Sequence, residues 1–212
     1  MTIEIRGKIE SQGKVGPGYS TDGNLVNSRM TKDLALVTQD LHGRFYESTC
    51  RGNTFIASTG AAGVAPGTAL STTPPFTLYN PSGSETHLVI ISSSIGYISG
   101  TLGSGSIYYA VNNNSSQAAP SGGTVLIPIC SLIGNNYAPK GKVFQGATLA
   151  TTPTLLKDLA IMGSTSTTPP IKDLIDGTII ITPGTSISLQ AVASAGIGLL
   201  FTFSMIWEEV KI

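Results

Sequence analysis

The chain has 212 residues with 12 basic and 12 acidic side chains, and charged residues make up only 11% of the sequence. With a formal net charge of zero, it has no overall basic field to hold nucleic acid and no acidic field to repel it. The length suits one large β domain or two small ones, and a chain of this length can bury a core that is stable without disulfide bonds or a bound metal.

The first residues differ from the rest in charge, because residues 1–51 hold 13 of the 24 charged side chains. Residues 10–28 are rich in Gly, Ser, Asn and Asp and contain little that could build a core. We therefore expect residues 1–30 to form an extended or loosely ordered arm and residues 31–212 to form one β domain. Isoleucines in the arm would add a short strand to a neighbour's sheet edge; a solvated terminal tail is the alternative.

From residue 34 onward, short apolar or alternating runs are separated by Gly, Pro and Asn, a pattern typical of strands and turns. The predicted strands cover residues 34–37, 43–47, 54–57, 76–79, 87–92, 95–100, 106–111, 124–129, 143–144, 177–182, 186–192 and 199–207. Such spacing indicates an all-β fold, an antiparallel sandwich or barrel of about ten short strands. Residues 154–162 fit a helix capped by Thr154 or, equally well, a strand.

Residues 187–207 carry no charge and are numerous enough to span a bilayer. Gln190, Ser194, Thr202 and Ser204 interrupt the run, and two glycines divide it. Two antiparallel core strands joined by a Gly turn explain the segment better than a membrane helix does. Nothing at the N-terminus resembles a secretory signal, so we expect synthesis in a cytoplasm.

Residues that could carry out catalysis are few. The only histidines are His42 and His87, and neither has the spacing of a metal site. Asp40, His42 and Ser48 could be imagined as a catalytic set, but nothing resembles a nucleophile elbow. We expect no enzyme, no cofactor and no metal.

The two cysteines, Cys50 and Cys130, lie far apart in the sequence and lack CxxC spacing. We interpret them as two buried free thiols, with a single disulfide as the alternative.

Between Gly52 and Pro139 the only charged residue is Glu85. A soluble surface normally carries roughly a quarter charged residues. A surface built from hydroxyls and amides suits a protein that is packed among neighbours better than a free enzyme.

Several short strings resemble small virion proteins of tailed bacteriophages, the capsid decoration or cement class. They are HGRFYE at 42–47, RGN at 51–53, GVAPGT at 63–68, FTLYNP at 76–81, GYISGTLG at 96–103 and WEE at 207–209. The similarity covers roughly residues 34–212. It implies a jelly-roll or related β-sandwich, often trimeric, that binds the outside of an icosahedral head and clamps neighbouring major capsid subunits. It implies no catalytic residues, while the charge balance and the strand pattern at residues 187–207 lead us to expect no nucleic acid and no membrane as partners.

Basic residues crowd the N-terminal quarter with acids between them, which indicates a docking surface for a charged partner rather than a nucleic-acid stripe. We expect this part of the chain to contact the capsid, through Ile3, Ile5, Arg6, Lys8, Arg29, Lys32, Arg44 and Arg51. The expected location is the capsid surface of the virion. The main alternative is a tail, fibre or head-fibre component that binds a glycan or receptor. A non-viral sugar-binding or enzymatic β domain and a membrane-associated protein are further alternatives.

Overall fold

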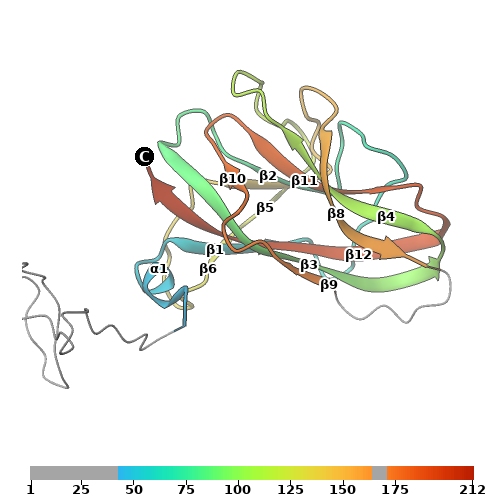
Figure 1. The fold of residues 1–212 in the computed structure, drawn as a ribbon, viewed down its shortest axis with the longest axis horizontal. Helices are drawn as coiled ribbons and strands as arrows, with labels where there is room; N and C mark the ends of the chain where they lie inside the picture. The colour runs from blue at the N-terminus through green and yellow to red at the C-terminus, as the bar shows by residue number, and fades with distance from the viewer. Residues whose placement is uncertain (1–42, 164–170) are drawn as a thin grey trace, which may run out of the picture. The chain divides into compact units, whose positions relative to one another are not determined.

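Nearly every regular element in the described part of the chain is a β-strand, which confirms the all-β prediction (Figure 1). The computed structural model describes residues 43–163 and 171–212, and Phe45–Ile212 form one compact unit. The described helix is α1, Tyr46–Cys50. The strands are β1 Thr54–Ser58, β2 Phe76–Tyr79, β3 Thr86–Leu102, β4 Gly105–Asn112, β5 Thr124–Leu126, β6 Ile129–Cys130, β7 Lys142–Gln145, β8 Thr154–Met162, β9 Ile171–Leu174, β10 Ile180–Ile181, β11 Ser186–Val192 and β12 Gly196–Lys211.

The strands form two antiparallel sheets. In the first sheet the order is β10-β3-β12-β1-β6, and β9 also pairs with β3. In the second sheet the order is β5-β7-β2-β11-β4-β8. The chain passes directly from β5 at one edge of the second sheet to β6 at the matching edge of the first sheet. Strands β8, β9 and β10 lie at the opposite edges.

The core lies between the two sheets and is built by strand alternation, since successive side chains of a strand point to opposite faces. Strand β12 gives the clearest case: Phe201, Phe203, Met205 and Trp207 are buried, while the residues between them are only partly buried. Large buried side chains of the second sheet complete the same cluster, among them Phe76, Leu78, Tyr109, Ile187 and Leu189. One continuous apolar core therefore holds the two sheets together.

One corner of the two sheets is joined through Asn80, which is fully buried just after β2. Its side-chain amide Nδ2 donates to the carbonyl oxygens of Thr86 (2.7 Å) and Ile181 (2.8 Å), at the start of β3 and the end of β10. Its main-chain N–H donates to Thr185, and its carbonyl accepts from Gly184. A single amide thus links the second sheet to two strands of the first and donates to a carbonyl of each. The Thr86 carbonyl also accepts from Ser84 Oγ at 3.2 Å.

Several strand predictions need correction, and the strand expected at 34–37 lies outside the described residues. Residues 124–129 were expected as one strand, but they contribute to β5 and β6 in different sheets, and of residues 177–182 only Ile180–Ile181 form a strand. Residues 43–47 were expected as a strand, but Phe45 to Arg51 make a short helical turn in which Thr49 N–H bonds Phe45 O and Arg51 N–H bonds Glu47 O. Residues 87–92 and 95–100 were expected as two strands, but they belong to the single long strand β3. The serines between them stay in the strand because they have partners there: Ser94 Oγ lies 2.6 Å from Ser204 Oγ on β12.

Residues 154–162, which fit helix or strand, form the edge strand β8. Its pairing with β4 shifts register at two places, which leaves Leu156 and Leu159 as extra residues. The uncharged run at 187–207 forms β11 and most of β12, as the strand prediction required, but these two strands belong to different sheets. No helix among the described residues is long and apolar enough to cross a membrane.

Candidate functional site

Most residues predicted to contact a capsid cannot be placed. Ile3, Ile5, Arg6, Lys8, Arg29 and Lys32 lie outside the described residues, as do Asp40 and His42. Arg44 is exposed. Arg51, just after α1, is also exposed, and its Nε lies 3.9 Å from a carboxylate oxygen of Glu47. Such an exposed pair contributes little to stability.

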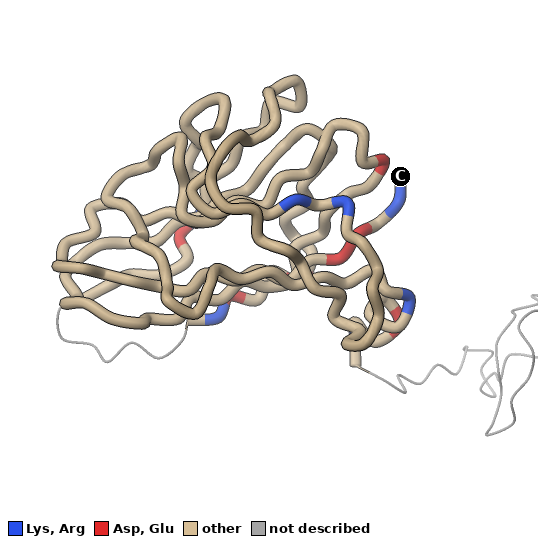
Figure 2. Tube along the Cα trace, turned by 180° about the vertical axis from the view of Figure 1, so that it is seen from behind, with Lys and Arg blue, Asp and Glu red and all other residues tan. Residues whose placement is uncertain are grey.

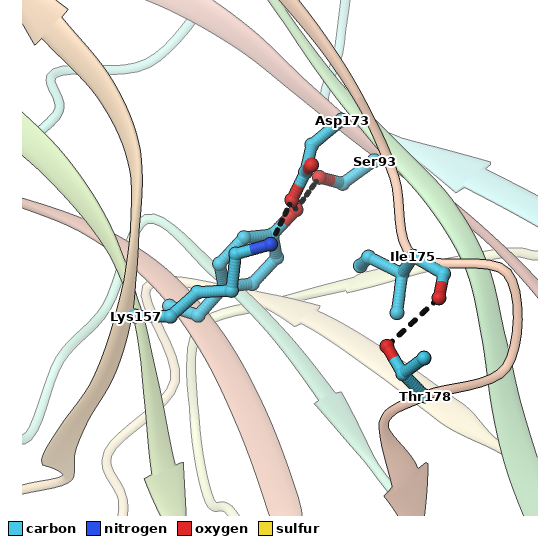
Figure 3. A network of polar contacts seen from close by, with 6 residues as sticks. Ser93, Lys157, Asp173, Ile175 and Thr178 are labelled. Carbon is cyan, nitrogen blue, oxygen red and sulfur yellow. Dashed lines mark hydrogen bonds and ion pairs between the residues drawn. The ribbon is translucent and has the colours of Figure 1, made fainter.

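A cluster of polar side chains lies where β3, β4, β8 and β9 meet (Figure 3). The hydroxyl of Tyr109 donates to Asp173 Oδ2 at 2.9 Å and is bonded by Ser93 Oγ. Lys157 Nζ donates to the same Asp173 oxygen at 2.9 Å and lies 5.7 Å from the centre of the Tyr109 ring. These contacts tie the second sheet to the first beside the core.

Burial raises the pKa of Tyr109, the nearby Asp173 carboxylate raises it further, and the bond from Ser93 opposes the shift. The phenol therefore remains protonated at neutral pH and does not act as a base or nucleophile. We interpret the Tyr109 cluster as a structural link between the sheets.

Other candidates for chemistry are also placed. Ser48 Oγ lies 2.9 Å from Thr54 Oγ1. His87 lies on β3 opposite Val210 of β12. Both cysteines are unpaired thiols; Cys130 is buried as expected, but Cys50 is exposed, because it lies at the end of the short surface helix α1. Within residues 43–163 and 171–212, no three His, Cys, Asp or Glu side chains gather as they would around a metal ion.

The most unusual surface is an apolar ridge on the segment that runs from β5 to β6. Val125 is 61% exposed, Ile127 84% and Ile129 59%, and Ile133 just beyond β6 is 81% exposed. The residues between them, including Leu126 and Cys130, point inward. We call these four exposed residues the outer ridge. A segment that is apolar on both faces normally has both faces covered.

A groove of about 400 Å³ lies at the opposite edge of the two sheets. Leu156 of β8, Ile180 of β10 and Val111 of β4 supply apolar surface there, and Asn112, Thr182 and Ser186 supply polar surface. None of the residues that line it is charged. We call it the edge groove. Exposed apolar side chains continue along the same edge at Leu155, Ile161 and Leu174.

A second groove, of about 520 Å³, is charged, and we call it the charged groove. Arg51, Lys140, Lys211, Glu85 and Glu209 line it together with the half-exposed ring of Tyr137. Figure 2 shows the charged positions gathered mainly toward the end of the unit that carries the C-terminus.

The floor of the charged groove is fixed in two ways. The Glu209 carboxylate accepts the N–H groups of Lys140 and Gly141, each at 2.9 Å, and Trp207 Nε1–H at 3.3 Å. The ring of Tyr137 lies so close to Gly52 that a Cβ there would be only 2.3 Å from it. This part of the surface is therefore held rigidly.

The sequence analysis did not single out the outer ridge, although a signal was present. Residues 125–130 read VLIPIC, with no polar residue to mark a solvent face. The edge groove has no such signal, because its walls come from separate parts of the chain that only the sheet topology brings together.

Comparison of the chain with protein-family models, with curated proteins and with solved structures finds no match. The fold and these surfaces therefore have to carry any functional inference.

Proposed function

We propose that this chain is a virion structural protein, a capsid decoration or cement protein that binds the outer surface of an icosahedral phage head and clamps neighbouring major capsid subunits. The observation that carries the proposal is the pair of uncovered apolar surfaces, the outer ridge and the edge groove, on a body with very little charge. Contiguous exposed apolar surface marks sites of interaction, and unpaired sheet edges are usually guarded by charge. A subunit that works inside an assembly has such surfaces covered by its neighbours.

We further propose that the two sheets form a jelly roll, and the nesting of the strand pairs supports this. Strand β1 pairs with β12, β2 with β11, β3 with β9 and β10, and β4 with β8, all antiparallel. This is the pairing of one long hairpin ribbon rolled into two sheets, with β5, β6 and β7 inserted between β4 and β8. Jelly rolls occur in viral capsid proteins and in lectins, so the fold is compatible with the proposal but does not select it.

In this proposal residues 1–30 are an extended arm that anchors the subunit to the major capsid protein. The basic residues of the arm and those at the start of the β domain, including Arg44 and Arg51, supply polar contacts to the capsid. The sandwich supplies contacts between subunits, with a trimer favoured, and the protein has no catalytic role. Multivalent display on a shell makes modest contacts strong.

The test is co-sedimentation of the purified chain with empty heads prepared from the phage or prophage that encodes it. We expect saturable binding at a fixed ratio to the major capsid protein. A chain that lacks residues 1–30 should keep the fluorescence of buried Trp207 but bind heads more weakly. Absence of binding by the full chain would overturn the proposal, and undiminished binding by the shortened chain would overturn the role of the arm.

One observation favours a second candidate, a tail or fibre component that binds a glycan. Tyr137 presents a half-exposed ring over the charged groove, whose lining includes the exposed amide of Asn53 as a partner for sugar hydroxyls. This candidate predicts retention on host cell envelopes that is lost in Tyr137→Ala. Retention on envelopes without head binding would favour it over the decoration role.

A further inference from the structure

The outer ridge is highly exposed, with side chains that are 59–84% accessible, and has an unusual pattern for an edge. Val125, Ile127 and Ile129 point outward at strand spacing, while Leu126 and Cys130 point into the protein. Its flanking strands have an unpaired outer side, since β5 pairs only with β7 and β6 only with β1 within the described residues. Pro128 lies between them and offers no N–H to an added strand. A partner of the ridge is therefore expected to pack against side chains rather than add a strand.

The edge groove is the concave counterpart. An apolar cavity of about 150 Å³ holds a benzene molecule, so a groove of about 400 Å³ has room for more than one aliphatic side chain. Its neighbouring strand β8 carries two bulges, which discourage strand addition. Contact there is again expected through side chains.

We infer that the outer ridge of one copy packs into the edge groove of a second copy of this chain. A patch on one part of a molecule that fits a pocket elsewhere on the same molecule makes a head-to-tail contact. Such contacts either close into a ring or continue as a filament, and a decoration subunit requires the ring. The inference names the partner of the proposed subunit, and only its expectation of a closed ring rests on the proposed function.

Charge favours a second copy over a nucleic acid or an anionic membrane. The ridge lies in a stretch without Asp, Glu, Lys or Arg from residue 86 to residue 139, and the groove lining is uncharged. The nearest ionic pair on the groove side, Lys157 with Asp173, is already satisfied internally. Among the residues that line the groove there is no cation for a nucleic acid or an anionic membrane, and beside the ridge there is the single exposed Lys142 of β7, next to Ile127.

Topology favours head-to-tail packing over ridge against ridge. The ridge and the groove lie at opposite edges of the same two sheets. A symmetric ridge-to-ridge dimer would leave Leu156, Ile180 and their apolar neighbours exposed. Head-to-tail packing covers both surfaces with one type of contact.

The test uses the full chain in the absence of capsids, by sedimentation velocity over a wide concentration range. The ridge variant is Ile127→Asp and the groove variant is Leu156→Asp. Ile197→Asp is the matched control, because Ile197 is 80% exposed at the start of β12 and lines neither surface. We expect the unmodified chain and the control to form the same oligomer, and each test variant to associate at least tenfold more weakly.

Mixing the two test variants gives the decisive result. The groove variant keeps an intact ridge and the ridge variant keeps an intact groove, so an equal mixture should form dimers that neither forms alone. The inference is overturned by a monomeric unmodified chain, by a groove variant that assembles normally, by a ridge variant that assembles normally, or by a mixture that stays monomeric. Ile180→Asp replaces Leu156→Asp if the latter loses the fluorescence of folded Trp207.

Because no capsid is present, this result is independent of the head-binding test. A chain that binds heads as a monomer would keep the proposed function and lose the inference. A chain that forms the ring without binding heads would keep the inference and lose the proposed function.

Discussion

Asn80→Ala should destabilise the fold far more than the loss of one small polar side chain would suggest. The Asn80 amide donates to the carbonyls of Thr86 and Ile181, at the corner where the two sheets are joined. Alanine cannot donate, and the site is fully buried, so water cannot replace the amide without a change in the structure. The Ile181 carbonyl would lose its side-chain donor, and the Thr86 carbonyl would keep only the weaker bond from Ser84 Oγ at 3.2 Å.

Each buried polar group left without a partner costs roughly 1–3 kcal/mol. Two carbonyls then give a loss of about 2–4 kcal/mol for Asn80→Ala, allowing for the milder cost of a carbonyl that keeps one bond. Asn112→Ala is the matched control, because Asn112 is also buried and donates to one carbonyl only, that of Thr151, at 3.0 Å. We expect the control to lose about 1 kcal/mol.

Urea unfolding followed by the fluorescence of Trp207 measures both variants, since the chain has a single tryptophan and it is fully buried. All variants are compared at one protein concentration because self-association adds to apparent stability. Equal losses for Asn80→Ala and Asn112→Ala, or a loss below about 1 kcal/mol for Asn80→Ala, would refute the reasoning from orphaned carbonyls.

Three further predictions test other features. The raised pKa of Tyr109 means that the folded state keeps a proton which the unfolded state loses near pH 10, so the free energy of unfolding should fall above about pH 10 by up to about 1.4 kcal/mol per pH unit. In Tyr109→Phe, urea unfolding should show a smaller fall with pH, and an equal fall in the variant and the unmodified chain would contradict the assignment. Gly122 and Gly123 have φ near +67° and +66°, but a Cβ on Gly122 meets nothing within 4 Å, whereas one on Gly123 meets backbone atoms at 2.5–2.7 Å. Gly122→Ala should lower the free energy of unfolding by about 1–2 kcal/mol, and Gly123→Ala should lower it clearly more. Similar urea midpoints for the two variants would count against the steric difference. One thiol, Cys50, should react rapidly with a thiol reagent in the folded protein, and Cys130 only after unfolding; two fast thiols in the native state would contradict its burial.

The sequence was most informative where apolar residues alternate or cluster between turn residues. The strands at 54–57, 76–79, 106–111 and 186–192 were predicted close to their observed limits, because each lies between clear turn signals and has a face in the core. The serines within β3 misled the prediction, since their hydroxyls are satisfied by partners on other strands that a single segment cannot reveal. The helix α1 was missed because its backbone bonds are local and it buries no residue to give a periodic signal.

The two proposed binding surfaces, the outer ridge and the edge groove, were less predictable from the sequence than the fold. The low charge of the chain indicated contact with neighbours but not where the contact lies. The sequence predicted one strand at residues 124–129, and its lack of polar residues was the signal for the outer ridge, although the segment forms two strands in different sheets. The edge groove depends on Leu156, Ile180 and Val111, which only the pairing of β8 with β4 and of β10 with β3 brings to one edge.

The position of β12 has a consequence for synthesis on the ribosome. Among the described strands β12 is translated last, yet it lies between β3 and β1 in the first sheet and supplies Phe203, Met205 and Trp207 to the core. The earlier strands of that sheet have no central partner until residues 196–211 have left the exit tunnel. A nascent chain interrupted before β12 therefore cannot complete its first sheet.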